Sequence, residues 1–335
     1  MAQEYSPEVV AGLTRMLGEA LPSWGVQPAA EIRLLNLSEN ATFGVADLII
    51  RVQRQGYSSL SEIRSELAWI QALVEEGIIQ TARPVSSVSG DMVVQLGAGT
   101  PQARYAVAFT RLPGQEPAPG EALPHWFEVI GGITARMHRH ARGWRRPDWF
   151  TRKLWNVATM VGEQPHWGPW QASMGLTPEG AAIITQTLLQ VTQQLADYGE
   201  GAQVFGLVHA DLRLANLLLD DDRLQLIDFD DCGFSWYLYD FAASLSFIEH
   251  LPEAPALLQA WIRGYGAIEP LSELDLAILP VLSILRRILL TAWLASHAEI
   301  PFAMEMGEQF TFDTVSLCRQ FLSGTYLSAT DTNEG

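Results

Sequence analysis

The sequence predicts an α+β protein with a small β-rich first part and a larger, mainly helical second part. Short apolar runs dominate up to Phe109, whereas long apolar patterns with helical spacing dominate after Gly114. One compact island of short strands, Val204–Ile227, lies within the helical part. The 335 residues, 48% of them apolar and 18% charged, are enough for two such parts of an ordinary globular protein.

The first part, residues 1–110, is expected to form an antiparallel sheet with one helix. The helix begins at Ser59-Leu60-Ser61-Glu62, which has the pattern of a capping box, and it ends near Gly77. The strands are short runs rich in Leu, Ile and Val at Glu31–Leu37, Leu48–Val52, Pro84–Val88, Met92–Leu96 and Arg104–Phe109, with a Gly-containing turn between the first two.

The second part, residues 115–330, is expected to be mostly helical, with residues 111–114 as a hinge between the two parts. The strands of the island flank a turn at Asp220-Asp221-Asp222, and the tryptophan-rich stretch 144–170 is expected to be irregular. Apolar residues recur at helical spacing in Pro124–Arg142, Pro178–Tyr198, Tyr237–His250, Ala254–Gly264 and Leu274–His297. His138, within the first of these helices, is expected to be a packing residue.

The charge balance argues against nucleic acid as a partner. Lys and Arg number 21 and Asp and Glu number 38, which gives a net charge of −17. Binding to a nucleic-acid backbone needs a basic surface that displaces counterions, and this chain lacks such an excess of cations. Cationic or amine-bearing substrates remain compatible with the charge, although an acidic solvated surface explains it equally well.

The sequence predicts a cytoplasmic protein with no membrane partner. Two cysteines in a chain of this length are typical of a reducing compartment, and the first ten residues have no basic or apolar segment typical of a signal peptide. The most apolar late stretch, Leu276–Ala295, has Arg286 and Arg287 at its middle. We therefore expect a buried helix in which these arginines either pair with buried acids or bind a substrate carboxylate.

The residues that carry chemistry are His209-Ala210-Asp211-Leu212-Arg213-Leu214-Ala215-Asn216, followed one hairpin later by Leu226-Ile227-Asp228-Phe229-Asp230. Phosphoryl transfer to an alcohol needs one carboxylate that accepts the hydroxyl proton, and oxygen ligands for a Mg²⁺ ion on the phosphates. An Asp with an Asn five positions later, and a second Asp after a hairpin, can supply these groups. Asp and Asn also cap local turns, but the second motif at this spacing favours the chemical interpretation.

This stretch resembles the catalytic loop and metal motif of the aminoglycoside phosphotransferase and choline kinase-like family, whose members are distant relatives of the protein kinases. The resemblance extends from about Asn36 to His297 and implies a bilobal protein kinase-like fold that uses ATP and Mg²⁺. It implies that Asp211 is the catalytic base and that His209 braces the loop. The implied ligands of Mg²⁺ are Asn216 and Asp228. Asp240 either anchors the loop, as the family implies, or simply caps a helix.

The resemblance also assigns a nucleotide side to the first part. Arg51 stands where the family has a phosphate-binding lysine, and the only lysine of the chain is Lys153 in the second part. Glu66 lies in the apolar stripe of the helix that begins at Ser59, so it either pairs with Arg51 or reaches water at the edge of the stripe. The resemblance further implies that Ser38 and Asn40 approach the phosphates and that the backbone at Thr110 and Leu112 binds adenine.

Two features separate this chain from the protein kinases. Ala210 replaces the arginine that couples the catalytic loop to a phosphorylated activation segment, and only residues 229–239 separate Asp228 from Asp240. These features favour a small metabolite as the hydroxyl acceptor, and with the acidic charge and the family resemblance we expect one that bears an amine. Two alternatives stay open: a bacterial stress-response Ser/Thr kinase, since that branch also lacks the segment, and a nucleotide-binding pseudokinase, because of Arg51. The oligomeric state cannot be predicted.

Overall fold

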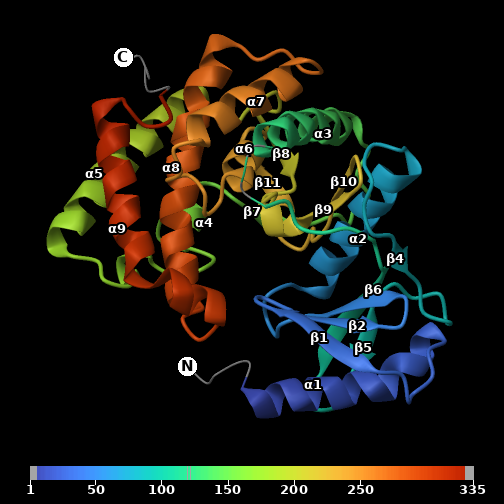
Figure 1. Ribbon diagram of the computed structural model, residues 1–335. Coiled ribbons are helices and arrows are strands. Elements are labelled where there is room, and N and C mark those ends of the chain that lie inside the picture. Colours follow the sequence, from blue (N-terminus) through green and yellow to red (C-terminus); the bar gives the residue numbers. More distant parts are fainter. Residues whose placement is uncertain (1–5, 119, 121, 329–335) are drawn as a thin grey trace. The chain divides into compact units, whose positions relative to one another are not determined.

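The computed structural model describes residues 6–118, 120 and 122–328, and the chain divides into two compact units. Unit 1 comprises residues 1–113 together with 146–152, and unit 2 comprises residues 114–145 and 153–335. Figure 1 shows a sheet in the first unit and mostly helices in the second, so the protein is α+β as predicted.

Unit 1 is built on an antiparallel sheet with strand order β1-β2-β3-β6-β4, and β5 pairs with β6. The strands are β1 (Ile32–Leu37), β2 (Ala41–Val45), β3 (Leu48–Val52), β4 (Pro84–Val85), β5 (Val94–Leu96) and β6 (Arg104–Thr110). One expectation was wrong here, because the segment between the first two predicted strands is mostly the strand β2 and not a turn. Its Gly44 lies within that strand and pairs with Ile49 of β3.

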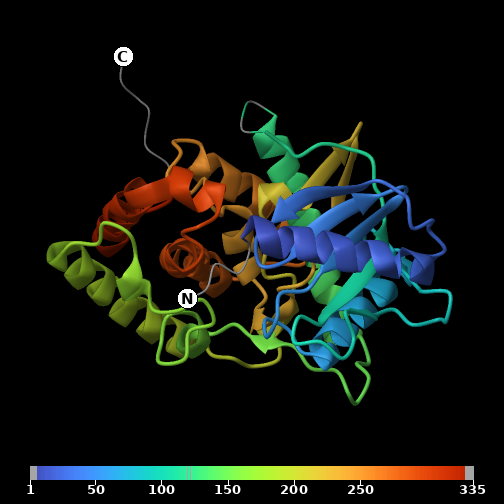
Figure 2. The ribbon, with the colours of Figure 1, turned by 90° about the horizontal axis from the view of Figure 1, so that it is seen from below.

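The two helices of unit 1 pack against opposite faces of the sheet (Figures 1 and 2). Side chains alternate along a strand, so Ile50 and Val52 of β3 enter the core formed with α1 (Pro7–Ala20), whereas Arg51 points to the other face. There it contacts α2 (Leu60–Glu75), which begins with the predicted capping box. The helix α1 was not predicted from the sequence; it begins at its cap Ser6 and is followed by a short 3₁₀ turn, Leu21–Trp24.

Unit 2 consists of helices around two small sheets. Its helices are α3 (Leu123–Gly143), α4 (Val157–Met160), α5 (Pro178–Tyr198), α6 (Tyr239–Ser244), α7 (Ala254–Gly266), α8 (Glu273–Ser296) and α9 (Pro301–Ser323). The strands β9 (Leu217–Asp220) and β10 (Arg223–Leu226) form the predicted hairpin. The other sheet has the order β7-β11-β8, with β7 at Lys153–Leu154, β8 at Phe205–Val208 and β11 at Gly233–Trp236.

Two helices of unit 2 differ from the sequence prediction. The helix expected over Tyr237–His250 is limited to the short α6, because Phe247 has a φ of +73°, which a right-handed helix does not permit. The helix α9, which packs against α5 and α8, was not predicted from the sequence. The stretch 144–170 is irregular as expected, apart from β7 and α4.

The long apolar helix α8 is a core element. By length and composition it could cross a membrane, but 83% of its most apolar window is buried inside the protein. Both arginines at its middle are buried as well: the side chain of Arg286 is 2% exposed and that of Arg287 is fully buried. Each of them pairs with a carboxylate, which decides between the two roles that the sequence left open for them.

Candidate active site

The loop 209–216 connects β8 to β9 and is held in place by a carboxylate from α6. Asp240 Oδ2 accepts a hydrogen bond from the His209 amide at 3.0 Å, and Oδ1 accepts one from the Ala210 amide at 2.7 Å. Ala210 has a φ of +68°, a conformation that L-residues rarely adopt. No side chain caps the first turn of α6, so Asp240 anchors the loop and is not a helix cap.

A histidine from α3 supports this anchor. His138 Nε2 lies 3.1 Å from Asp240 Oδ2, and its Nδ1 lies 3.1 Å from the hydroxyl of Tyr265 in α7. Burial lowers the pKa of His138 and outweighs the opposite effect of Asp240, so the imidazole is neutral. The sequence analysis expected only a packing residue here, because nothing in the local pattern of α3 reveals a partner 102 positions away.

His209 connects the loop to the start of the second motif. Its Nδ1 lies 3.3 Å from the Asp211 amide, and its Nε2 lies 3.3 Å from the carbonyl oxygen of Ile227. A neutral imidazole with its proton on Nε2 satisfies both contacts, because Nδ1 then accepts and Nε2 donates. The ring also lies against Phe229, with the ring centroids 4.3 Å apart. This geometry braces the loop.

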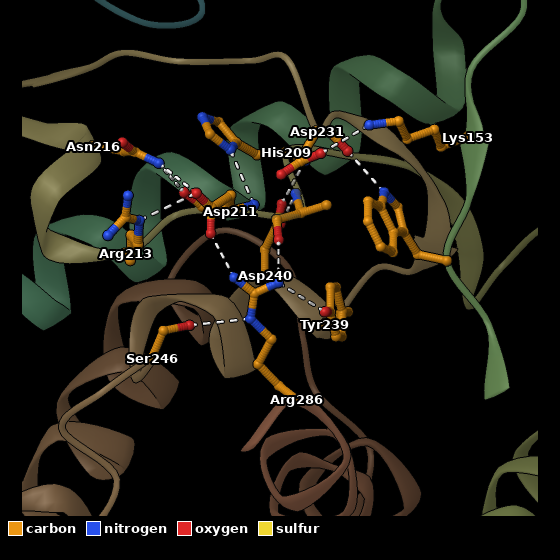
Figure 3. Close-up of polar contacts among 12 residues, drawn as sticks. Lys153, His209, Asp211, Arg213, Asn216, Asp231, Tyr239, Asp240, Ser246 and Arg286 are labelled. Atoms are coloured by element: carbon orange, nitrogen blue, oxygen red, sulfur yellow. Dashed lines mark hydrogen bonds and ion pairs between the residues drawn. The ribbon is translucent and has the colours of Figure 1, made fainter. Parts of the chain in front are cut away.

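Asp211 is held by three donors, and its side chain is 16% exposed (Figure 3). Oδ2 accepts hydrogen bonds from Asn216 Nδ2 at 2.7 Å and from Arg213 Nε at 3.3 Å. Oδ1 accepts one from Arg286 Nη2 at 2.5 Å. The carboxylate therefore has a fixed orientation and is still reached by solvent.

Asn216 is oriented so that its oxygen remains available. Its Nδ2 donates to Asp211 Oδ2 and, at 2.8 Å, to the Asp211 carbonyl oxygen. The amide oxygen accepts no hydrogen bond in the part of the chain that the structure describes, and it is the atom that a hard cation would bind. Residues 6–118, 120 and 122–328 contain no cluster of three or more His, Cys, Asp or Glu suited to a metal. Mg²⁺ typically needs only one or two protein carboxylates in addition to phosphate oxygens and water.

The second motif is held from β7. Asp228 follows β10 and has a φ of +62°, so both motifs contain a residue in the left-handed region. Three residues later, Asp231 Oδ1 pairs with Lys153 Nζ at 3.2 Å, and the Asp231 carbonyl accepts from Trp155 Nε1 at 2.8 Å. Both charged side chains of this pair are at least nine-tenths buried. The single lysine of the chain thus fixes the segment after Asp228.

Arg286 also belongs to the site, although its place there could not be predicted from the sequence. Besides Asp211 it contacts Ser246 Oγ, the Ala210 carbonyl oxygen and the Tyr239 hydroxyl, at 3.1, 3.3 and 3.0 Å. Burial by itself lowers the pKa of Arg286, but the neighbouring Tyr239 and Asp211 outweigh burial and raise it. The guanidinium therefore stays charged. The only signal in the sequence was an arginine in an apolar helix, which indicates some buried partner without naming it.

Among the residues of unit 1 that were predicted to bind the nucleotide, Arg51 and Glu66 form the expected pair. Arg51 Nη2 donates to both carboxylate oxygens of Glu66, at 2.6 and 2.7 Å, and the side chains are 5% and 1% exposed. The alternative, that Glu66 reaches water, was wrong. Gln53, which the sequence analysis missed, joins this pair to Asn40: in the amide orientation that satisfies both of its ends, it accepts from Arg51 Nε and donates to Asn40 Oδ1.

The remaining predicted residues of unit 1 lie in two places. Ser38 and Asn40 form the tight turn before β2, where the Ser38 amide donates to the Asn40 carbonyl at 3.1 Å and Asn40 Oδ1 accepts from the Arg54 amide. Thr110 ends β6, and its amide donates to the Arg83 carbonyl. Leu112 follows it, and its backbone forms no hydrogen bond within the described residues, so its amide and carbonyl are available to a ligand.

The chain is similar to known kinases over almost its whole length. An aminopropanol kinase associated with a microcompartment has a solved structure that is 37% identical, with a TM-score of 0.86, covering 94% of this chain and 99% of that one. Amicoumacin kinase of Bacillus subtilis (strain 168) is 22% identical over 331 residues, 95% of this chain and 94% of its own. A solved structure of amicoumacin kinase hAmiN in complex with AMP-PNP, Ca²⁺ and Ami has a TM-score of 0.74 at 21% identity, over 98% of this chain and 96% of that one. The family model described as the phosphotransferase enzyme family matches residues 33–275, so this chain belongs to that family and has a protein kinase-like fold.

Proposed function

We propose that this protein transfers the γ-phosphoryl group of ATP to a hydroxyl of a small, amine-bearing molecule, with Asp211 as the catalytic base. The observation that carries the proposal is the Asp211 carboxylate, which three donors hold in one orientation while its side chain stays 16% exposed. A fixed and accessible carboxylate can orient an acceptor hydroxyl and take its proton.

The acceptor is proposed to be an amino alcohol of the aminopropanol type. The relative at 37% identity is an aminopropanol kinase, and its structure covers almost the whole of both chains. A net charge of −17 suits an acceptor that carries a protonated amine. We further propose that the reaction takes place in the cytoplasm, without nucleic-acid or membrane partners.

Asn216 and Asp228 are proposed to hold Mg²⁺. The amide oxygen of Asn216, which accepts no hydrogen bond from the described residues, fits this role, and a related kinase has been solved with AMP-PNP and Ca²⁺. The metal, when bound, neutralises charge on the transferring phosphate. The protein holds the ligands in place: His209 connects the two motifs, and the pairing of Lys153 with Asp231 fixes the segment after Asp228.

In unit 1, Arg51 is proposed to contact the phosphates while Glu66 holds its guanidinium. Glu66 fixes the orientation of the Arg51 guanidinium, and a guanidinium can bind phosphate oxygens in a bidentate manner. Ser38 and Asn40 are proposed to lie near the phosphates through their turn. The open backbone at Leu112, next to Thr110, is proposed to bind adenine.

The test is Mg²⁺-dependent release of ADP from ATP with a panel of hydroxylated amines, led by aminopropanol. Asp211→Asn is compared with Asp222→Asn, which changes an exposed carboxylate in the β9–β10 turn. We expect Asp211→Asn to lower turnover by about 10²- to 10⁴-fold while ATP still binds, and Asp222→Asn to behave like the wild type. Unchanged turnover in Asp211→Asn would refute the assignment of the base.

The acceptor class is tested separately with labelled ATP and a whole-cell lysate. Label in small molecules supports the proposal, whereas label in protein bands supports a Ser/Thr protein kinase. Nucleotide binding without transfer to any acceptor or to water would support a pseudokinase.

A further inference from the structure

Arg286 reaches the catalytic loop from a distant part of the chain. It lies in the middle of α8, 75 residues after Asp211, and its side chain is 2% exposed. Figure 3 shows its guanidinium between Asp211, Tyr239 and Ser246. Placing a charge in such an environment is unfavourable unless the geometry and the hydrogen bonds compensate for its desolvation. A buried arginine aimed at a reactive carboxylate therefore calls for a functional explanation.

The hydrogen bonds of Asp211 leave one position open. Each carboxylate oxygen has two lone-pair sites. Asn216 and Arg213 occupy both sites of Oδ2, whereas Arg286 occupies one site of Oδ1. Within the described ranges, no protein donor uses the second site of Oδ1. An acceptor hydroxyl that approaches Asp211 thus finds Oδ1 as the oxygen with a vacant lone pair.

Arg286 is itself locked, so it can fix that oxygen in place. Nε donates to Ser246 Oγ, and Nη1 donates to the Tyr239 hydroxyl and to the carbonyl of Ala210, the residue with a φ of +68°. Because the guanidinium is planar, these three contacts determine where Nη2 points. The ring of Trp167 lies 5.5 Å from the guanidinium carbon and closes a further side.

We propose that Arg286 is a positioning residue that holds the Asp211 carboxylate so that Oδ1 receives the acceptor proton. This inference rests on the proposed function, and it assigns the acceptance of the hydroxyl proton to one oxygen atom of Asp211. As the acceptor oxygen forms its bond to the γ-phosphorus, the bond from that phosphorus to the bridging oxygen of ADP breaks, and the hydroxyl proton moves to Asp211 Oδ1. The electron pair of the broken bond leaves with ADP, and the proton is later released to solvent.

The matched variants are Arg286→Lys, which keeps the charge but not the fork, and Ser246→Ala, which removes only the contact to Nε. Their controls are Arg287→Lys and Ser283→Ala, both in α8. Arg287 pairs with Glu249 and Ser283 contacts Tyr326, so neither touches the site. Each variant is assayed for ATP affinity by fluorescence titration and for transfer of the γ-phosphoryl group, with aminopropanol and with water as acceptors. Circular dichroism and Tm report on folding.

We expect Arg286→Lys to lower turnover by about 10- to 100-fold with nearly unchanged ATP affinity, since a small displacement of a catalytic group has effects of this size. Ser246→Ala is expected to lower turnover by about threefold, and the controls leave turnover per folded molecule unchanged. If Arg286→Lys folds and keeps wild-type turnover, the inference is wrong. If Arg286→Lys does not fold, the comparison of Ser246→Ala with Ser283→Ala decides. Equal turnover in these two variants refutes the inference.

Asp211→Asn in the same assay separates this inference from the proposed function. Loss of activity in Asp211→Asn with full activity in Arg286→Lys overturns only the role of Arg286. Full activity in Asp211→Asn overturns the proposed function, and so does a wild type that transfers phosphate to neither acceptor.

Discussion

Two arginine–carboxylate pairs, one in each unit, show how the same chemistry can meet different needs. In the pair of Arg51 and Glu66, both oxygens of the carboxylate face one guanidinium nitrogen and the carboxylate is 1% exposed. In the pair of Arg286 and Asp211, the arginine is equally buried, but the carboxylate is 16% exposed and keeps one lone pair open. In the proposed mechanism the first pair holds an arginine in place for the phosphates, whereas the second holds a carboxylate in place for proton transfer.

The largest difference is expected in stability when each carboxylate is lost. Glu66→Leu should lower the free energy of unfolding by about 3–5 kcal/mol, because the charge of Arg51 then stays buried without its partner. Asp211→Asn should lower it by about 1 kcal/mol, since Arg286 keeps three neutral acceptors and Asn can still accept a hydrogen bond. Urea denaturation followed by tryptophan fluorescence measures both. Equal losses would show that the two pairs are energetically alike.

The anchor of the catalytic loop is expected to affect both stability and activity. Asp240→Asn replaces one acceptor oxygen by an amide that faces backbone N–H donors, so the free energy of unfolding should fall by about 2 kcal/mol. Turnover should fall by about 10- to 100-fold, because the backbone before Asp211 is no longer fixed. The control is Asp313→Asn on α9, which among the described residues pairs only with Gln309 and should change neither quantity. A destabilised variant with normal turnover would show that the anchor is purely structural.

His138 predicts a pH dependence of stability with a definite sign. Its pKa is lowered in the folded state, so below about pH 6.5, the ordinary pKa of histidine, the unfolded chain binds a proton that the folded chain does not. This group contributes its full stability above that pH and loses it as the pH falls. Between pH 7.5 and 5.5 we expect His138 to lower the free energy of unfolding by at most about 1.4 kcal/mol, the limit reached when only the unfolded chain takes up the proton. Urea denaturation of His138→Gln at the same two pH values should show a smaller decrease in the free energy of unfolding than the wild type shows. Equal decreases in the two proteins would contradict the predicted sign.

The smallest effect concerns the helices that carry the two pairs. α2 carries Glu66 and begins at the capping box of Ser59 and Glu62, whereas α8 carries Arg286 and begins at the capping box of Ser272 and Asp275. Ser59→Ala and Ser272→Ala should each lower the free energy of unfolding by about 1 kcal/mol without changing turnover per folded molecule. Thermal unfolding and the ADP assay check this. A loss of turnover in either variant would mean that the helix end itself positions the site.

Features that depend on neighbours in sequence were predicted well. The bounds of α5 match the expected helix residue for residue, and the capping box of α2 forms with both of its hydrogen bonds. The pair of Arg51 and Glu66 could be expected because an acid in an apolar stripe needs a partner and the family offered one. The helix α6 was predicted too long, because apolar spacing continues through Phe247 although the backbone there leaves the helical region.

The sequence by itself determined the α+β class and the two motifs that carry Asp211, Asn216 and Asp228, because periodicity, caps and motif spacing act over a few residues. Only the tertiary structure decided which groups hold these motifs in place. Arg286, His138 and Lys153 reach their partners from 75, 102 and 78 residues away. A charge or an imidazole within an apolar segment of the sequence indicates that a partner is needed, but many acidic residues of the chain could be that partner. The partner is chosen by the packing of α3, β7 and α8 around the loop, which no local pattern records.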